Sequence, residues 1–154
     1  MISDVTNLQS SLDAKAGLAS PAFTGTPTAP SAAAYADSAQ IATTGNVSAT
    51  IKTIPENAQT GTSYTLVLPD AGKLVTLNNA AAITLNIPTE ASVAFPVNTR
   101  VDIVQIGAGQ VTVGGAGLTI RSSGSRLKLA GQWSAATLWK KATNEWYLIG
   151  DIVA

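Results

Sequence analysis

The first residues of the chain carry an apolar stripe with helical spacing. Residues 2–14 read ISDVTNLQSSLDA, and apolar side chains recur every three or four positions at Ile2, Val5, Leu8 and Leu12. This stripe predicts an amphipathic helix within residues 1–16. Because the helix is short and its stripe narrow, it would be only marginally stable alone in water. We therefore expect a coiled coil with partner helices; a frayed terminal helix, or one lying on its own domain, is the alternative.

Residues 17–50 lose this periodicity and are dominated by small side chains and prolines. Gly17 can end the preceding helix, and Pro21 disfavours helical backbone at the residue before it. The stretch TGTPTAP cannot form a continuous β ladder, because each proline lacks a backbone donor. Too little apolar surface is present to offset the entropy of ordering one copy. We expect an extended shaft, ordered against copies of itself, or a flexible linker.

From residue 51 onward apolar and polar residues alternate with period two. The pattern predicts strands near 63–68, 73–77, 82–87, 100–106, 110–113, 118–121, 126–130, 135–140 and 145–152. Turns fall between them, at PDAG (69–72), at Asn78-Asn79 and at the glycines that follow residue 106. Such a sequence is typical of an all-β sandwich, barrel or stacked roll. We predict a β-sandwich or jelly-roll-like head over residues 51–154, with many short antiparallel strands.

The inward positions of these strands predict the core of the head. The expected core residues are mostly aliphatic: Leu66, Leu68, Val75, Leu77, Ile83, Leu85, Ile87, Val101, Ile103, Ile106, Val111, Val113, Leu118, Ile120, Leu127, Leu129, Leu138, Trp146, Leu148 and Ile152. This core is thin for about 100 residues, a size at which much surface stays exposed. We expect association of subunits to help bury this core.

Composition and charge exclude several classes of function. The chain has no histidine and no cysteine, so His-based metal sites, Ser-His-Asp triads and thiolate chemistry are ruled out, and we expect no metal and no cofactor. The net charge is zero, so no long-range field attracts nucleic acid or a membrane surface. No segment is apolar enough to insert into a bilayer, and residues 1–4 do not resemble a secretory signal.

The carboxylates of the β region do not suggest catalysis. Sugar-cleaving enzymes need two acids at one cleft. The available acids are spread along the chain, and we expect ordinary surface charge for Glu56, Asp70, Glu90, Asp102, Glu145 and Asp151. Asp102 has a further option, an ion pair with Arg100 or Arg121. The glycines of GAGQVTVGGAG (107–117) lack the lysine and helix of a phosphate-binding loop, so they predict turns. We expect a protein that is not an enzyme.

One cluster of cations and aromatic residues predicts a binding surface. Between Arg121 and Lys141 the chain has five cations and no acid, and two tryptophans fall in the same span. Cations beside aromatic faces suit sugars and anionic groups such as lipopolysaccharide phosphates. The candidate receptor-binding residues are Arg121, Arg126, Lys128, Trp133, Trp139, Lys140, Lys141 and Asn144, with Ser122–Ser125 and Lys140–Asn144 as exposed loops. The alternative is a solvated strand face with tryptophans buried at subunit contacts.

Residues 2–47 closely resemble a segment of the tail fibres of tailed bacteriophages. The similarity lies in ISDVTNLQSSLDAKAGLASPAFTGTPTAP and in the later QIATTGNV, where an aromatic residue is usual before the valine in the family. The region from VAFPVNTRVDIVQIG to the final YLIGDIVA is similar to β domains at the ends of phage tail and other virion fibres.

This resemblance implies a homotrimer located in the virion, made in the host cytoplasm and released by lysis. It further implies docking to other tail or baseplate proteins through the N-terminal region, and attachment to a bacterial surface receptor, a glycan or lipopolysaccharide. A purely structural collar or decoration fibre is the alternative. A polysaccharide depolymerase fits less well, and a bacterial trimeric adhesin would need an export signal and a membrane anchor.

Overall fold

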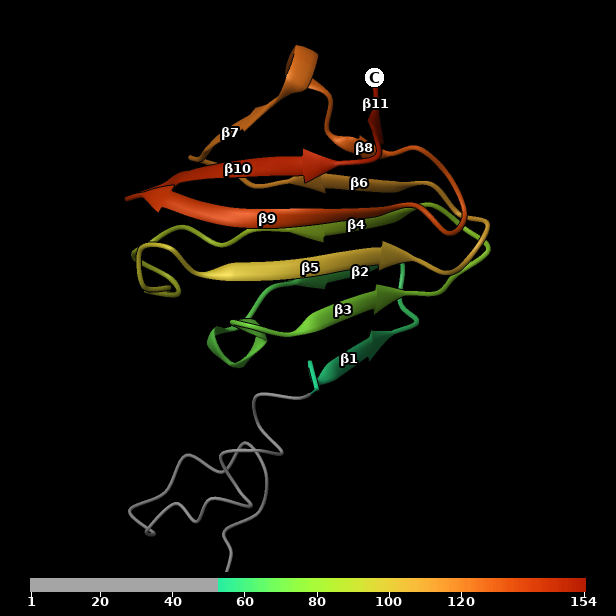
Figure 1. The fold of residues 1–154 in the computed structure, drawn as a ribbon, viewed down its shortest axis with the longest axis horizontal. Helices are drawn as coiled ribbons and strands as arrows, with labels where there is room; N and C mark the ends of the chain where they lie inside the picture. Colours follow the sequence, from blue (N-terminus) through green and yellow to red (C-terminus); the bar gives the residue numbers. More distant parts are fainter. Residues whose placement is uncertain (1–52) are drawn as a thin grey trace, which may run out of the picture. The chain divides into compact units, whose positions relative to one another are not determined.

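The computed structural model describes residues 53–154, which form a β-rich head (Figure 1). The described residues form one compact unit, Thr53–Ala154. The expected coiled-coil residues Ile2, Val5, Leu8 and Leu12 and the expected shaft at 17–50 lie outside the described residues.

Eleven strands and two short 3-10 turns make up the head. In chain order they are β1 (Glu56–Gln59), β2 (Ser63–Thr65), η1 (Leu68–Asp70), β3 (Leu74–Leu77), β4 (Ile83–Asn86), β5 (Arg100–Gln105), β6 (Val111–Gly114), β7 (Thr119–Ser122), η2 (Ser123–Ser125), β8 (Lys128–Leu129), β9 (Ala135–Ala142), β10 (Glu145–Gly150) and β11 (Ile152–Val153). The prediction of an all-β head is confirmed. Strand β1 was not predicted, because ENAQ is polar and lies at an exposed edge.

The strands form two mixed sheets, so the expectation of many short antiparallel strands holds for only part of the pairs. The first sheet has the order β1-β3-β5-β9-β10-β7, and the second has the order β11-β8-β6-β4-β2. Pairs β1–β3, β3–β5, β2–β4, β4–β6 and β7–β10 are parallel. Pairs β5–β9, β9–β10, β6–β8 and β8–β11 are antiparallel. Period-two alternation reports only that one face of a strand is buried, so it cannot distinguish the two directions.

The parallel part arises because strands β1 to β6 alternate between the two sheets, so that the chain winds as a short coil. Each turn of the coil stacks on the previous one, and like residues meet in register, as with Val75 beside Ile103 and Leu85 beside Val113. We call residues 53–114 the coil half. Of the alternatives from the sequence, a stacked roll describes this half best.

The turns of the coil half also stack, at one end of the sheets. The backbone N–H of Gly109 donates to the carbonyl of Asn79 at 2.9 Å, and the Asn79 side chain donates to the carbonyl of Thr60 at 2.6 Å. A Cβ on Gly109 would lie 1.9 Å from the carbonyl oxygen of Ala81. Glycine is required there because the preceding turn of the coil, at Asn79 and Ala81, approaches its backbone directly.

The remaining strands extend the two sheets of the coil half, mainly by antiparallel pairing. Strands β9 and β10 form an antiparallel hairpin that extends the first sheet, and β8 and β11 extend the second. We call residues 115–154 the hairpin half. Figure 1 shows β7 diverging from β10 toward η2, where their pairing ends at Ser122 and Leu148.

The core lies between the two sheets and is closed within one chain. Most of the expected core residues are buried, including Leu77, Ile103 and Leu138, each 0% exposed. The exceptions are Leu68, which is 49% exposed in η1, and the partly buried Ile106, Leu118, Ile120 and Leu127. Phe95 was missed; it packs edge-to-face on Trp146, with ring centroids 5.5 Å apart. The head core therefore needs no second subunit to be buried.

A buried carboxylate stabilises the first turn of the coil half through hydrogen bonds. Asp70 is 1% exposed, which corrects the expectation of a solvated turn residue. It accepts hydrogen bonds from Asn57 Nδ2 at 2.7 Å, from Tyr64 Oη at 2.8 Å and from the Val67 N–H at 2.9 Å. Burial, followed by the hydrogen bond to Asp70, raises the pKa of Tyr64 above its ordinary value. These contacts join β1, β2 and η1 in one network.

Candidate functional site

The outer face of the first sheet carries a row of aromatic and arginine side chains. The strand register places Arg100 of β5 beside Trp139 of β9, Trp139 beside Tyr147 of β10, and Tyr147 beside Arg121 of β7. The row crosses four adjacent strands, which corresponds to about 14 Å at the usual strand spacing. We call these four residues, together with Ile149, the aromatic row.

The aromatic residues of this row form a corner that is open to solvent. The rings of Trp139 and Tyr147 are perpendicular, with centroids 6.3 Å apart. Trp139 is 42% exposed and Ile149 is 56% exposed. Large apolar side chains on a regular strand are normally covered, so a group of them on one face indicates a contact surface.

Both arginines of the row are held by acids. Arg100 Nε lies 2.9 Å from Asp102 Oδ1, and Thr137 Oγ1 donates to the same carboxylate oxygen at 2.6 Å. Arg121 forms an ion pair with Glu145, and this contact raises the pKa of the Arg121 guanidinium above its ordinary value. Of the two partners that the sequence allowed for Asp102, the structure selects Arg100.

Two hollows lie along the row and share Ile149. The first has a volume of about 490 Å³ and is lined by Asn98, Arg100, Thr137, Trp139 and Ile149. The second, of about 350 Å³, lies where β7 diverges from β10 and is lined by residues of β7, η2 and β10 together with Ile152. Among the described residues, Ser122 Oγ is a buried polar atom without a hydrogen-bond partner, and Ser122 lines this second hollow.

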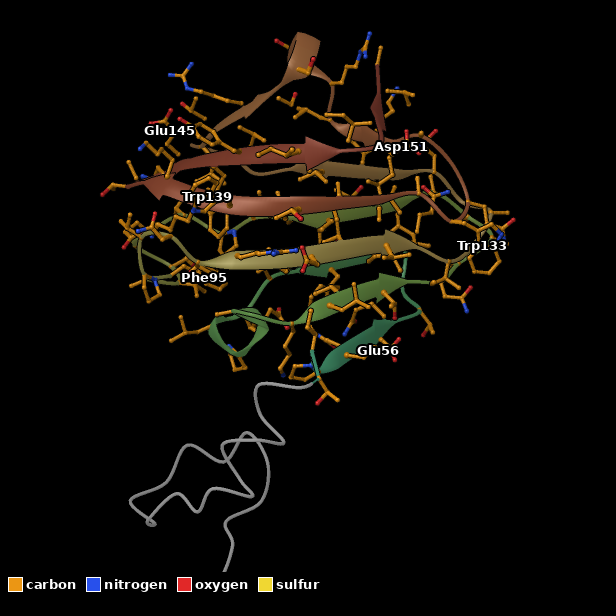
Figure 2. All side chains as sticks on the ribbon, viewed as in Figure 1. Glu56, Phe95, Trp133, Trp139, Glu145 and Asp151 are labelled. Atoms are coloured by element: carbon orange, nitrogen blue, oxygen red, sulfur yellow. The ribbon has the colours of Figure 1, made fainter. Side chains whose placement is uncertain are left out.

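The structure does not bring the two predicted tryptophans together. Figure 2 shows Trp139 and Trp133 near opposite ends of the first sheet. Trp133 lies in the loop before β9, is 68% exposed and has a φ of 71°. Its backbone N–H donates to the Gln105 carbonyl at 2.7 Å, so it is fixed in place away from the aromatic row.

Lys140 lies inside the head, which corrects the expectation that it is exposed in a loop. It is 2% exposed, and its ammonium group donates to the Glu90 carboxylate and to the Phe95 carbonyl. Because β9 continues to Ala142, position 140 falls on the inward face of a strand. Lys140 therefore anchors the loop that contains Glu90 and Phe95.

The other predicted residues are dispersed. Arg126 is exposed after η2, and Lys128 of β8 donates to the main-chain oxygen of Ala154 at 3.2 Å. Lys141 is exposed on β9, while the Asn144 side chain accepts the Glu90 N–H at 2.7 Å and shapes the β9–β10 turn. Of the expected exposed loop Ser122–Ser125, residues 123–125 are exposed, whereas Ser122 ends β7 and its hydroxyl is buried. Of the predicted set, only Arg121 and Trp139 belong to the aromatic row.

The sequence interpretation missed Arg100, Tyr147 and Ile149. A signal was present: the strands that contain Arg100, Trp139 and Tyr147 alternate with period two, and these residues occupy the outward phase. Their order across the sheet was hidden, because β5 and β9 are separated by β6, β7 and β8 in the chain. Sequence proximity had instead grouped Trp139 with Trp133.

No group of acids suitable for a metal ion is found within residues 53–154. Over the same residues, no helix is long and apolar enough to span a bilayer. Comparison with known proteins gives no family: no protein-family model matches the sequence, and no curated protein shows a significant match. The candidate site therefore rests on the geometry of the head and on the resemblance seen in the sequence.

Proposed function

We propose that this protein is a non-enzymatic tail fibre of a tailed bacteriophage that attaches the virion to a receptor on the bacterial surface. In this proposal the protein acts in the virion as a homotrimer, assembled through the coiled-coil stripe Ile2, Val5, Leu8 and Leu12. The N-terminal region docks to another tail or baseplate protein. The all-β head presents the aromatic row to a surface glycan.

The observation that carries the attachment role is the aromatic row on a closed head. The core of the head is complete within one chain, so Trp139 and Ile149 are not needed on the inside. Their exposure beside hydrogen-bonding arginines gives the mixture of apolar and polar groups that binding sites use. The resemblance of residues 2–47 to tail fibres supplies the biological setting.

The test is binding of the fluorescently labelled full chain to a panel of bacterial strains, read by flow cytometry. We expect strong binding to a subset of strains, loss after periodate oxidation of the cell surface, and retention after protease treatment. Periodate destroys vicinal diols of sugars, so this pattern identifies a glycan receptor. Absence of binding to every strain would favour a purely structural fibre, and release of reducing sugar ends would favour a depolymerase.

A further inference from the structure

The aromatic row combines an apolar platform with arginines that are already neutralised. We infer that this face binds an uncharged oligosaccharide, with Trp139 and Tyr147 packing against sugar rings and the flanking ion pairs binding hydroxyl groups. This inference rests on the proposed attachment function and specifies the ligand class and the residues for it. It departs from the expectation of a cationic patch for phosphates.

The platform suits the faces of sugar rings. A pyranose presents C–H groups on its faces and hydroxyl groups around its edge, and the C–H groups pack on aromatic surfaces. Trp139 is 42% exposed, and Tyr147 stands perpendicular to it at 6.3 Å, so the two rings form a corner rather than a flat patch. Ile149, 56% exposed, extends the apolar surface along β10. A ligand here gains aromatic contact without reorganising the sheet.

The ion pairs of the aromatic row favour a neutral ligand. Arg100 is paired with Asp102 at 2.9 Å, and Arg121 is paired with Glu145, so each arginine of the row has an acid beside it; Lys141, on the same side of β9 as Trp139, is outside the row. A phosphate or carboxylate would have to displace these acids or lie close to them. A hydroxyl group can instead accept from the remaining guanidinium N–H groups and donate to carboxylate lone pairs. The fixed pairs therefore offer donors and acceptors with no net charge.

The two hollows indicate that the bound oligosaccharide contributes more than one sugar ring to the contact. They lie on either side of Ile149, with volumes of about 490 and 350 Å³, which fall within the usual range of small-molecule sites. An oligosaccharide lying across β10 would use both hollows.

The test uses an array of bacterial glycans that contains neutral, uronic-acid and phosphorylated members, probed with the full chain. We expect binding to neutral glycans, with an affinity that changes less than about twofold between about 50 and 500 mM NaCl, because no long-range charge attraction contributes. Trp139→Ala is expected to weaken binding about tenfold or more, as for other central aromatic contacts. Trp133→Ala, which removes an equally large exposed side chain elsewhere, is expected to leave binding unchanged.

A second variant keeps the test decisive if Trp139→Ala fails to fold. Ile149→Gln replaces an exposed side chain shared by both hollows and is expected to weaken binding several-fold with an unchanged thermal midpoint. The inference would be overturned by no binding to any array member, by binding confined to anionic glycans, or by unaltered binding of Trp139→Ala. A changed subunit count of Trp139→Ala in light scattering would also overturn it, because the row would then be a subunit contact.

The array and the cell assay separate the two claims. Binding to neutral glycans through Trp139 without binding to any strain would refute the attachment function and leave the site standing. Periodate-sensitive binding to cells together with anionic array hits would leave attachment standing and refute the neutral-ligand inference.

Discussion

The coil half and the hairpin half of the head bury similar aliphatic residues but differ in what they expose. In the coil half, stacked turns and the Asp70 network satisfy polar groups internally, and Gly109 is closed off by the turn beneath it. In the hairpin half, β9 and β10 place Trp139, Tyr147 and Ile149 on an open face. We infer that the coil half acts mainly as scaffold, while the hairpin half carries most of the aromatic row, to which β5 of the coil half adds Arg100.

The largest effect on stability is expected at the buried lysine of the hairpin half. Lys140→Met removes the donor to Glu90 and to the Phe95 carbonyl while keeping the apolar stem. We expect a loss of about 3 kcal/mol in the free energy of unfolding, because the buried Phe95 carbonyl and the partly exposed Glu90 carboxylate both lose their donor. Urea denaturation measures this loss. Lys141→Met, at the exposed neighbouring position, is the control, and equal losses for the two variants would contradict the assignment.

The next effect tests the stacked turns of the coil half. Gly109→Ala introduces a Cβ 1.9 Å from the Ala81 carbonyl oxygen, so the turn must shift. We expect a loss of about 2 kcal/mol, in the range of other overpacked sites, measured by the midpoint of urea unfolding. Gly131→Ala is a matched control, because no atom lies within 4 Å of its added Cβ. A tolerated Gly109→Ala would show that the turns do not stack closely.

A smaller effect is expected at the Asp70 network. Tyr64→Phe removes one hydrogen bond to Asp70, for a loss of about 1 kcal/mol. The raised pKa of Tyr64 adds a pH signature. The folded state holds the phenol proton more tightly than the unfolded chain, so this contribution is full below about pH 10 and is lost as the pH rises through the folded pKa.

Stability curves between neutral and alkaline pH check this signature. The wild type should lose stability more steeply above about pH 10 than Tyr64→Phe, in the window where tyrosine titrates. Tyr147→Phe should keep the wild-type slope, because Tyr64 is still present. Identical pH dependence of stability for the wild type and Tyr64→Phe would show that the Asp70 network does not raise the pKa of Tyr64.

The smallest effect on stability is expected on the aromatic row. Arg121→Gln breaks the pair with Glu145 at a solvent-exposed position, and exposed pairs contribute little. We expect no measurable change in the thermal midpoint. A large fall would mean that the row is part of the scaffold, which would weaken the contrast between the two halves.

The sequence predicted much of the strand content, because alternation at sites such as Val101, Ile103 and Leu138 directly reflects burial on one face. It could not predict that β1 to β6 wind as a coil, since direction depends on which sheet each connection reaches. The polar strand β1 and the buried Asp70 were also missed, because their partners are distant side chains rather than local pattern.

The candidate site was predicted only in part. Arg121 and Trp139 were identified from composition, but proximity in the chain grouped them with Lys140 and Trp133. One of these is buried on the opposite face of β9, and the other lies at the far end of the sheet. Arg100 and Tyr147 join Trp139 only through pairing of β9 with both β5 and β10, which is a property of the fold.

The most direct test of the recognition role of the aromatic row is cell binding by two tryptophan variants of the full chain, one within the row and one outside it. On a strain that binds the wild type, we predict that Trp139→Ala loses about tenfold or more of its apparent affinity while Trp133→Ala keeps it. Equal affinity of both variants and the wild type would contradict a recognition role for the aromatic row.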